Sequence, residues 1–251
     1  MAAEQPKTSR ILTALAGIAI CCTVALALFY GPRLIVYYYL HRDEPVFTLT
    51  PQSLSDHATN AQEGRSFSQF GYEFEVPWKD VDRVDNLKSV ARIYFKSGPV
   101  LIFFDPQKRI DRIKALDATT QNGNALRVLF GPRAPISNYE LLKAILSTTP
   151  QDVSPLTGTN DLFRNSMLLT LKLSELPNGV SYLYSIETPS FRGFQKGDPL
   201  HDKKVIILDL FNRQDHELEL WVGRQQETSA TITQADINRI VQTLHPTSEL
   251  R

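Results

Sequence analysis

The stretch with the best side chains for binding lies at residues 189–203, between two expected strands. It brings together two phenylalanines and two cations, Phe191, Arg192, Phe194 and Lys196. Aromatic rings and arginine are enriched at the energetic centres of protein interfaces. A connection of about 15 residues is longer than most loops, and loops of that length are often binding elements. We therefore expect these four residues to contact a partner, unless both rings fold back over the sheet edge and both cations are solvated.

Histidine and aspartate pairs stand on either side of the strand that follows this stretch. They are His201-Asp202 and Asp215-His216, and their side chains could bind a cation or transfer protons if the fold brought them together. No two of the five histidines have the spacing at which one helix face binds a metal. Solvated turn residues are the favoured interpretation, so we expect no metal site and no cofactor.

The sequence holds none of the short motifs that mark common catalytic sites. Absent are G-x-S-x-G, H-E-x-x-H, the Walker-type phosphate loop, G-x-G-x-x-G and C-x-x-C. These absences argue against several standard hydrolase, zinc and nucleotide chemistries, although catalytic residues can be scattered along a chain. We predict no catalytic residue and favour a non-enzymatic protein. The alternative is a membrane-anchored or secreted enzyme, such as a hydrolase, without a recognisable motif.

The first long apolar run, residues 11–30, contains no charged residue and has the length of a helix that crosses a bilayer. Its flanking cations are Lys7 and Arg10 on one side and Arg33 and Arg42 on the other. This bias is weak, but the short preceding segment favours an N-terminus in the cytoplasm and a C-terminal domain outside it. We therefore predict a single-pass membrane anchor with an extracytoplasmic domain.

A cleaved signal peptide is the alternative interpretation of the run. Residues 25–27 form a small-x-small cleavage pattern. The apolar character continues past them to residue 30 and, beyond Gly31-Pro32, to residue 40, which favours a retained anchor. Because proline removes a helical donor and restricts the residue before it, a kink or a stop is expected at Gly31-Pro32.

Charge and composition exclude some partners. Residues 43–251 carry 23 basic and 26 acidic side chains, a net charge of −3 that gives no case for nucleic acid. The only cysteines, Cys21 and Cys22, lie inside the apolar run, so the rest of the chain has no disulfide. About 200 residues follow the run, enough for a substantial core without disulfides or metals.

Residues 42–65 are polar and irregular and predict a tether. Large apolar residues then occupy every second position of residues 70–78, with glutamates between them, which predicts a strand with one buried face. Residues 90–96 and 100–104 predict a hairpin. The second of these strands is apolar throughout, so we expect it at the centre of the sheet and covered on both faces.

Helical spacing and capping signals predict helices in the middle of the chain and at its end. Apolar residues recur at helical spacing over residues 110–116, and Ser137 and Glu140 form a capping box that begins the next helix. A longer helix follows over residues 161–175. Three strands are then expected, at residues 180–188, 204–211 and 216–222. A last helix begins at a second capping signal, Thr233 to Asp236.

This order predicts an α+β fold: an antiparallel sheet with packed helices in an α/β sandwich, preceded by one N-terminal transmembrane helix. The expected divisions are an N-terminal tail (1–10), the anchor and juxtamembrane segment (11–40), a tether (41–69), a single α+β domain (70–246) and a tail (247–251).

The segment FGYEFEVP at residues 70–77, the late pair of strands and the closing TQADINRIVQTL resemble the PsbP-like family of small α/β/α domains, in element order and amphipathic pattern. The resemblance covers roughly residues 70–246 and implies an extracytoplasmic accessory domain that assists a membrane complex by binding. We therefore expect a membrane-anchored, non-enzymatic accessory or binding domain with a protein partner. A purely structural role in envelope or membrane organisation is a further alternative.

Overall fold

The computed structural model describes most of the chain from residue 45 onward. The described residues are 19, 21–24, 26, 29–35, 37–38, 45–54, 59, 64–118, 125–154, 156, 158–202, 205–225 and 231–247. The predicted tail at residues 1–10 and all but the first residue of the tail at 247–251 lie outside this set.

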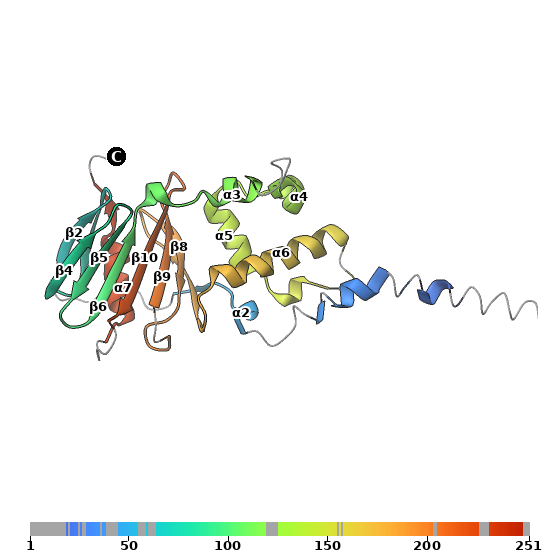
Figure 1. Ribbon diagram of the computed structural model, residues 1–251, viewed down its shortest axis with the longest axis horizontal. Coiled ribbons are helices and arrows are strands. Elements are labelled where there is room, and N and C mark those ends of the chain that lie inside the picture. The colour runs from blue at the N-terminus through green and yellow to red at the C-terminus, as the bar shows by residue number, and fades with distance from the viewer. Residues whose placement is uncertain are drawn as a thin grey trace, which may run out of the picture.

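Two β-sheets form one end of the elongated molecule (Figure 1). Their strands are β1 (Gln52–Ser53), β2 (Arg65–Gln69), β3 (Tyr72–Val76), β4 (Val81–Asn86), β5 (Val90–Phe95), β6 (Pro99–Phe104), β7 (Leu183–Glu187), β8 (Arg192–Lys196), β9 (Val205–Phe211), β10 (Glu217–Arg224) and β11 (His245–Pro246). The larger sheet has the order β1-β7-β8-β9-β10-β6-β5-β4, and the smaller has the order β11-β3-β2. All neighbours are antiparallel except β1 and β7, which are parallel.

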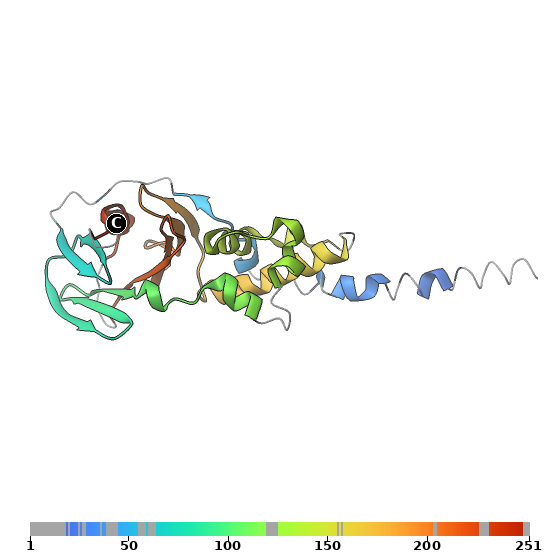
Figure 2. The same cartoon turned by 90° about the horizontal axis from the view of Figure 1, so that it is seen from above.

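One helix packs among the strands, and five others form a lobe beside the larger sheet (Figures 1 and 2). The first is α7 (Gln234–Thr243), which Figure 2 shows end-on, enclosed by strands of both sheets. The helical lobe consists of α2 (Pro45–Thr48), α3 (Arg112–Ala118), α4 (Ala125–Phe130), α5 (Asn138–Ser147) and α6 (Thr159–Glu175). Short 3₁₀ turns are η1 (Pro106–Lys108), η2 (Gly131–Arg133) and η3 (Pro150–Asp152). A mixed α+β fold with a large sheet and packed helices is thus confirmed.

Strand alternation places the main core between the two sheets and α7. The even-numbered residues of β9 and β10 enter this core, and Leu208, Leu218 and Leu220 have no exposed surface. Phe74 of β3 stacks on Phe103 of β6, with their ring centroids 5.3 Å apart. Successive side chains of a strand point to opposite faces, so the odd-numbered residues of β9 and β10 face the helical lobe.

Both predicted N-caps begin helices where expected, and the capping box is complete at Thr233. Thr233 Oγ1 accepts from the Asp236 amide at 3.2 Å, and the Asp236 carboxylate accepts from the Thr233 amide at 2.9 Å, which starts α7. Ser137 Oγ accepts from the Glu140 amide at 3.1 Å and starts α5. The caps satisfy amides that have no partner inside the helix. One face of α5 then packs on β7–β9, and the opposite face packs on α4 and α6.

Several sequence expectations differ from the structure. The tether expected at residues 41–69 includes α2, β1 and β2, and the sheet edges β2 and β4 were missed because their sequences, RSFSQ and VDRVDN, are polar and mostly exposed. The strand expected to be covered on both faces, β6, alternates between buried and half-buried residues. Only its inner face enters the main core, through Leu101 and Phe103.

Every described residue between 19 and 38 is helical, including Gly31 and Pro32. Of the kink or stop expected at Gly31-Pro32, the stop is therefore wrong, since a proline removes one helical hydrogen bond without requiring the helix to end. No helix among the described residues is long and apolar enough to cross a bilayer. Residues 11–18 of the apolar run lie outside those residues.

A buried lysine joins the segment that enters the domain to the helical lobe. Lys172 of α6 has no exposed surface. Its ammonium donates to the carbonyl oxygens of Thr148 at 2.8 Å, Phe47 at 3.2 Å and Leu49. Burial lowers the pKa of Lys172 to about 8. Three carbonyl dipoles replace the water that this ammonium loses, so Lys172 clamps residues 47–49 against α6.

Replacing the clamp should destabilise the domain. We expect K172M to lower the free energy of unfolding by about 3 kcal/mol, because three buried carbonyl oxygens lose their donor. Urea denaturation of the full chain in detergent, with limited proteolysis at residues 45–54, measures both consequences. K143M removes an exposed lysine from the neighbouring α5 and is the control. Equal stability of the two variants would show that Lys172 is no clamp.

Candidate functional site

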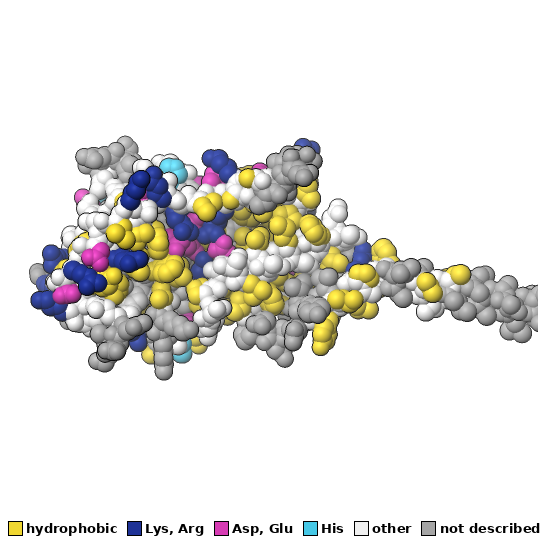
Figure 3. Space-filling model, viewed as in Figure 1, with side chains coloured by type: hydrophobic (Ala, Val, Ile, Leu, Met, Phe, Trp, Pro, Cys, Tyr) yellow, Lys and Arg dark blue, Asp and Glu magenta, His cyan; other side chains and the backbone are white. Residues whose placement is uncertain are grey.

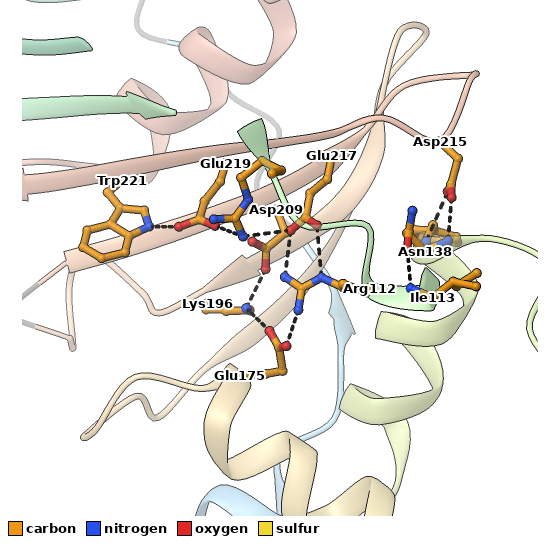
Figure 4. Close-up of polar contacts among 12 residues, drawn as sticks. Arg112, Ile113, Asn138, Glu175, Lys196, Asp209, Asp215, Glu217, Glu219 and Trp221 are labelled. Carbon is orange, nitrogen blue, oxygen red and sulfur yellow. Dashed lines mark hydrogen bonds and ion pairs between the residues drawn. The ribbon is translucent and has the colours of Figure 1, made fainter. Parts of the chain in front are cut away.

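Charged side chains from three parts of the chain converge where the larger sheet meets the helical lobe. This charge cluster consists of Arg109, which follows η1, Arg112 of α3, Glu175 of α6, Lys196 of β8, Asp209 of β9, and Glu217 and Glu219 of β10. Figure 3 shows acidic and basic side chains gathered at this junction, with hydrophobic side chains on both sides. Figure 4 shows that the acids of the sheet and the cations of the lobe point toward one another.

Strand register explains why three acids lie together. Asp209 of β9 is the partner of Glu219 in β10, and Glu217 lies two residues before Glu219 on the same face. Their carboxylates point away from the main core and toward the lobe. The side chains of Asp209, Glu217 and Glu219 are 1%, 4% and 9% exposed. Three carboxylates this deeply buried need compensating charge.

Arg112 supplies the geometrically best pair of the cluster. Its Nε donates to Glu217 Oε2 at 3.0 Å and its Nη2 to Glu217 Oε1 at 2.7 Å, which is the two-pronged contact of a guanidinium with a carboxylate. Its third nitrogen, Nη1, donates to Glu175. Burial opposes the charge of Arg112, but Glu217 and Glu175 outweigh it and raise the pKa of the guanidinium.

Arg109 and Lys196 match the remaining acids. Arg109 Nη2 pairs with Glu219 and lies 3.4 Å from Glu217 Oε1. Lys196 Nζ lies 2.6 Å from Asp209 Oδ2 and 3.3 Å from Glu175 Oε2. Burial alone would lower the pKa of Lys196, but Asp209 and Glu175 hold that pKa above its ordinary value. Each cation of the cluster therefore faces two carboxylates.

Glu219 is the acid of the cluster with the environment of a proton donor. Burial raises the pKa of Glu219, the nearby charge of Asp209 adds to this, and Arg109 opposes it. A carboxyl group with a raised pKa beside other carboxylates is the usual arrangement of a general acid. Here, however, both oxygens are engaged, because Oε1 accepts from Trp221 Nε1 and Oε2 pairs with Arg109.

The three acids also have the spacing of a cation site. One carboxylate oxygen from each of Asp209, Glu217 and Glu219 lies within 4.8 Å of the others. Oδ1 of Asp209 has no hydrogen-bond partner among the described residues, whereas Oδ2 lies 2.6 Å from the Lys196 ammonium. Carboxylate oxygens are the ligands that Mg²⁺ and Ca²⁺ prefer. Arg109, Arg112 and Lys196 already supply positive charge to this space.

A second polar contact joins sheet and lobe nearby (Figure 4). Asp215, in the turn between β9 and β10, accepts from the backbone amides of Asn138 and Tyr139, the latter at 3.2 Å. These amides belong to the first turn of α5, where amides lack helical partners and the helix dipole favours a negative charge. Asn138 Oδ1 in turn accepts from the Ile113 amide at 3.1 Å, which links α5 to α3.

Five of the 15 residues of the expected binding loop form a strand. Residues 192–196 form β8, and Phe191 and Phe194 are 2% and 1% exposed because they pack in cores on opposite faces of the sheet. Lys196 is buried in the charge cluster. A loop is therefore wrong for Arg192, Phe194 and Lys196, which belong to β8, and Phe191 directly precedes that strand. The sequence did not indicate this strand because the partners of Phe194 and Lys196 lie in elements distant along the chain.

Arg192 is the one of the four that reaches the surface. Its side chain is 47% exposed, and its guanidinium lies over the Tyr139 ring at 4.0 Å from the centroid. A guanidinium over an aromatic face is a favourable contact, and Arg192 Nη1 also pairs with the exposed carboxylate of Glu140 at 3.8 Å. Contact of the four residues with a partner stays a prediction, for which Arg192 offers the exposed surface.

The histidine and aspartate pairs do not meet. His201-Asp202 precedes β9 and Asp215-His216 follows it, so about 20 Å of strand separates them. Asp198 accepts from the His201 ring at 2.9 Å, and Asp215 caps α5. His216 lines a separate hollow of about 580 Å³. The enzyme hypothesis that gathers these four residues in one site is therefore wrong.

Of the residues of the charge cluster, the sequence analysis singled out Lys196 as a candidate and missed the others. Glu217 and Glu219 alternate with leucines, which is also the pattern of a solvated strand face, and the lobe that covers them is distant in sequence. The available signal was Asp209, an acid in the centre of the apolar segment VIILDLF. A carboxylate in such a strand requires a partner and so predicts a buried polar site.

No known family, curated protein or solved structure matches this chain. The resemblance to PsbP-like domains therefore stays a prediction.

The cluster should be a major source of stability. We expect R112M to lower the free energy of unfolding by about 3–5 kcal/mol, because it leaves Glu217 and Glu175 buried without their main partner. R112K should lie between wild type and R112M, since lysine restores the charge but not the two-pronged contact. Chemical denaturation measures the change.

The matched control is K114M, which removes a cation on the same helix whose side chain is 84% exposed. It should leave stability unchanged, as is usual for surface ion pairs. If R112M and K114M unfold alike, the cluster does not hold the lobe on the sheet.

Proposed function

We propose that this chain is a membrane-anchored, non-enzymatic accessory domain that holds a sheet at a fixed distance from the bilayer for a protein partner. The observation that carries this is the closed pairing of the charge cluster. The groups best suited to chemistry, Glu219 and Asp209 among them, are matched by Arg109, Arg112 and Lys196. Charges paired across sheet and lobe serve to join two parts of a structure.

The arrangement of the chain supports the anchored part of the proposal. The apolar run at residues 11–30 precedes the lobe, and the lobe lies between that end of the chain and the sheets (Figures 1 and 2). Arg33 Nη2 donates to Thr159 Oγ1 at 2.6 Å, so the end of the run contacts the first residue of α6. α6 then extends over 17 residues, about 25 Å, to Glu175 in the charge cluster.

An enzyme that uses a divalent cation is a second candidate function. It is favoured by the convergence of Asp209, Glu217 and Glu219 and by Oδ1 of Asp209, which accepts no hydrogen bond from a described residue. A cation at these oxygens could activate a water molecule for hydrolysis. It would have to displace Arg109 or Lys196 from the acids, which is why we rank this candidate second.

Topology and processing test the first candidate together. A reporter active only outside the cytoplasm, fused after Arg251, should be active in a chain of intact mass that stays in membranes after an alkaline wash. An active reporter on a soluble chain that lacks residues 1–27 would indicate a cleaved signal peptide and would rule out the anchor. A silent reporter on a stable chain would overturn the orientation and the proposal with it.

Divalent cations separate the two candidates. If the cluster is a closed joint, millimolar Mg²⁺, Mn²⁺ or Ca²⁺ should leave the thermal midpoint of the purified full chain unchanged. Binding to the native state would raise the midpoint in a saturable way. A rise that is lost in D209N would favour the enzyme candidate, whereas a rise that D209N retains would reflect cations bound elsewhere.

A further inference from the structure

We infer that the end of the helical lobe farthest from the sheets lies in the lipid headgroup layer, and that Phe163 of α6 contacts lipid there. The inference deepens the proposed function, because it depends on the apolar run being a membrane anchor. It specifies the surface through which the domain meets the bilayer. It also specifies the orientation in which the sheets are held.

The contact between Arg33 and Thr159 places this end of α6 at the level of the membrane surface. The apolar run ends at residue 30, so Arg33 is the first charged group after it. A cation directly beyond a membrane-crossing segment extends toward the headgroups. Its guanidinium lies 4.2 Å from the centre of the Phe29 ring and donates to Thr159. Thr159 is therefore held within one side-chain length of the lipid surface.

Phe163 lies on the same face of α6 as Thr159, one turn further along. Residues four apart in a helix are neighbours on one face. The rise between them is about 6 Å, and the headgroup layer on each side of the hydrocarbon core is about 5–8 Å thick. α6 runs roughly along the long axis of the molecule in both ribbon views (Figures 1 and 2). Phe163 consequently falls within the depth of the headgroups.

The exposure of apolar side chains at this end fits a lipid environment. Phe163 is 57% exposed, and Leu156, just before α6, is 82% exposed. Tyr38, in the helix that continues from the apolar run, is 71% exposed. Aromatic rings are favoured at the membrane interface, where their apolar bodies leave water. Asp161 is paired with Arg164 at 3.1 Å, so the first turns of α6 present no unmatched carboxylate to the phosphates.

Fluorescence quenching in the full chain tests the contact. The variant F163W is reconstituted in phosphatidylcholine vesicles that carry a nitroxide on the headgroup. The wild-type chain, measured in the same vesicles, gives the fluorescence of Trp78 and Trp221, which is subtracted. L200W is the matched control, since Leu200 is 81% exposed and lies four residues after Lys196, at the opposite end of α6. Both substitutions replace an exposed apolar residue, so circular dichroism should show an unchanged fold.

The added fluorescence of F163W should fall at least about twofold more than that of L200W, as expected for a ring at headgroup depth. Equal quenching of the two in vesicles that carry the chain would overturn the lipid contact while leaving the anchor intact. A chain that does not float with the vesicles would overturn the anchor as well. The emission maximum of F163W could instead shift with the protein-to-lipid ratio while the nitroxide does not quench it. That result would indicate that a second copy of the chain covers this surface, and it would also overturn the inference.

Discussion

Removing a charge from water is costly unless an opposite charge or oriented dipoles replace the water, and this requirement governs how the helical lobe meets the sheet. Asp209, Glu217 and Glu219 have no neighbours in the sheet that could neutralise all of them. Arg109 and Arg112 reach these acids only when the segment after β6 lies across β10. Glu175 then pairs with both Arg112 and Lys196. An apolar contact tolerates small shifts, but the two-pronged contact of Arg112 allows one placement.

The same requirement is met by dipoles at two other joints. Lys172 uses three carbonyl groups, and Asp215 uses amides at the start of α5. The three polar joints position different parts of the lobe. The cluster positions α3 and α6, Asp215 positions α5, and Lys172 positions the segment that enters the domain. Between them the apolar contacts of Leu142 and Leu146 with the sheet supply the non-directional attraction. The lobe is therefore positioned by polar contacts and attached by apolar ones.

Sequence reasoning succeeded where the signal was local. The serine cap at Ser137, the capping box at Thr233 and the alternation in β3 depend on neighbours within a few residues, and the structure has them as expected. It failed where burial depends on distant elements. Phe194 and Lys196 resemble loop residues until α5 and α6 cover them, and Glu217 resembles a surface residue until Arg112 reaches it. The candidate site is built entirely from such long-range partners, so its members could not be assembled from spacing alone.

The two-residue strand β1 has a mechanical consequence. The chain passes from the apolar run through the residues held by Lys172 to β1, whose only pairing is with β7, and then to the rest of the sheet. Under a pull between the membrane and a partner on the sheet, the contact of Arg33 with Thr159, the packing of buried Phe47 and the Lys172 contacts would bear the load first. The short β1–β7 pair would bear it after they open. Because none of these contacts belongs to the charge cluster or to the core between the two sheets, their opening would lengthen the link between the membrane and the sheets while the sheets stay joined to the lobe.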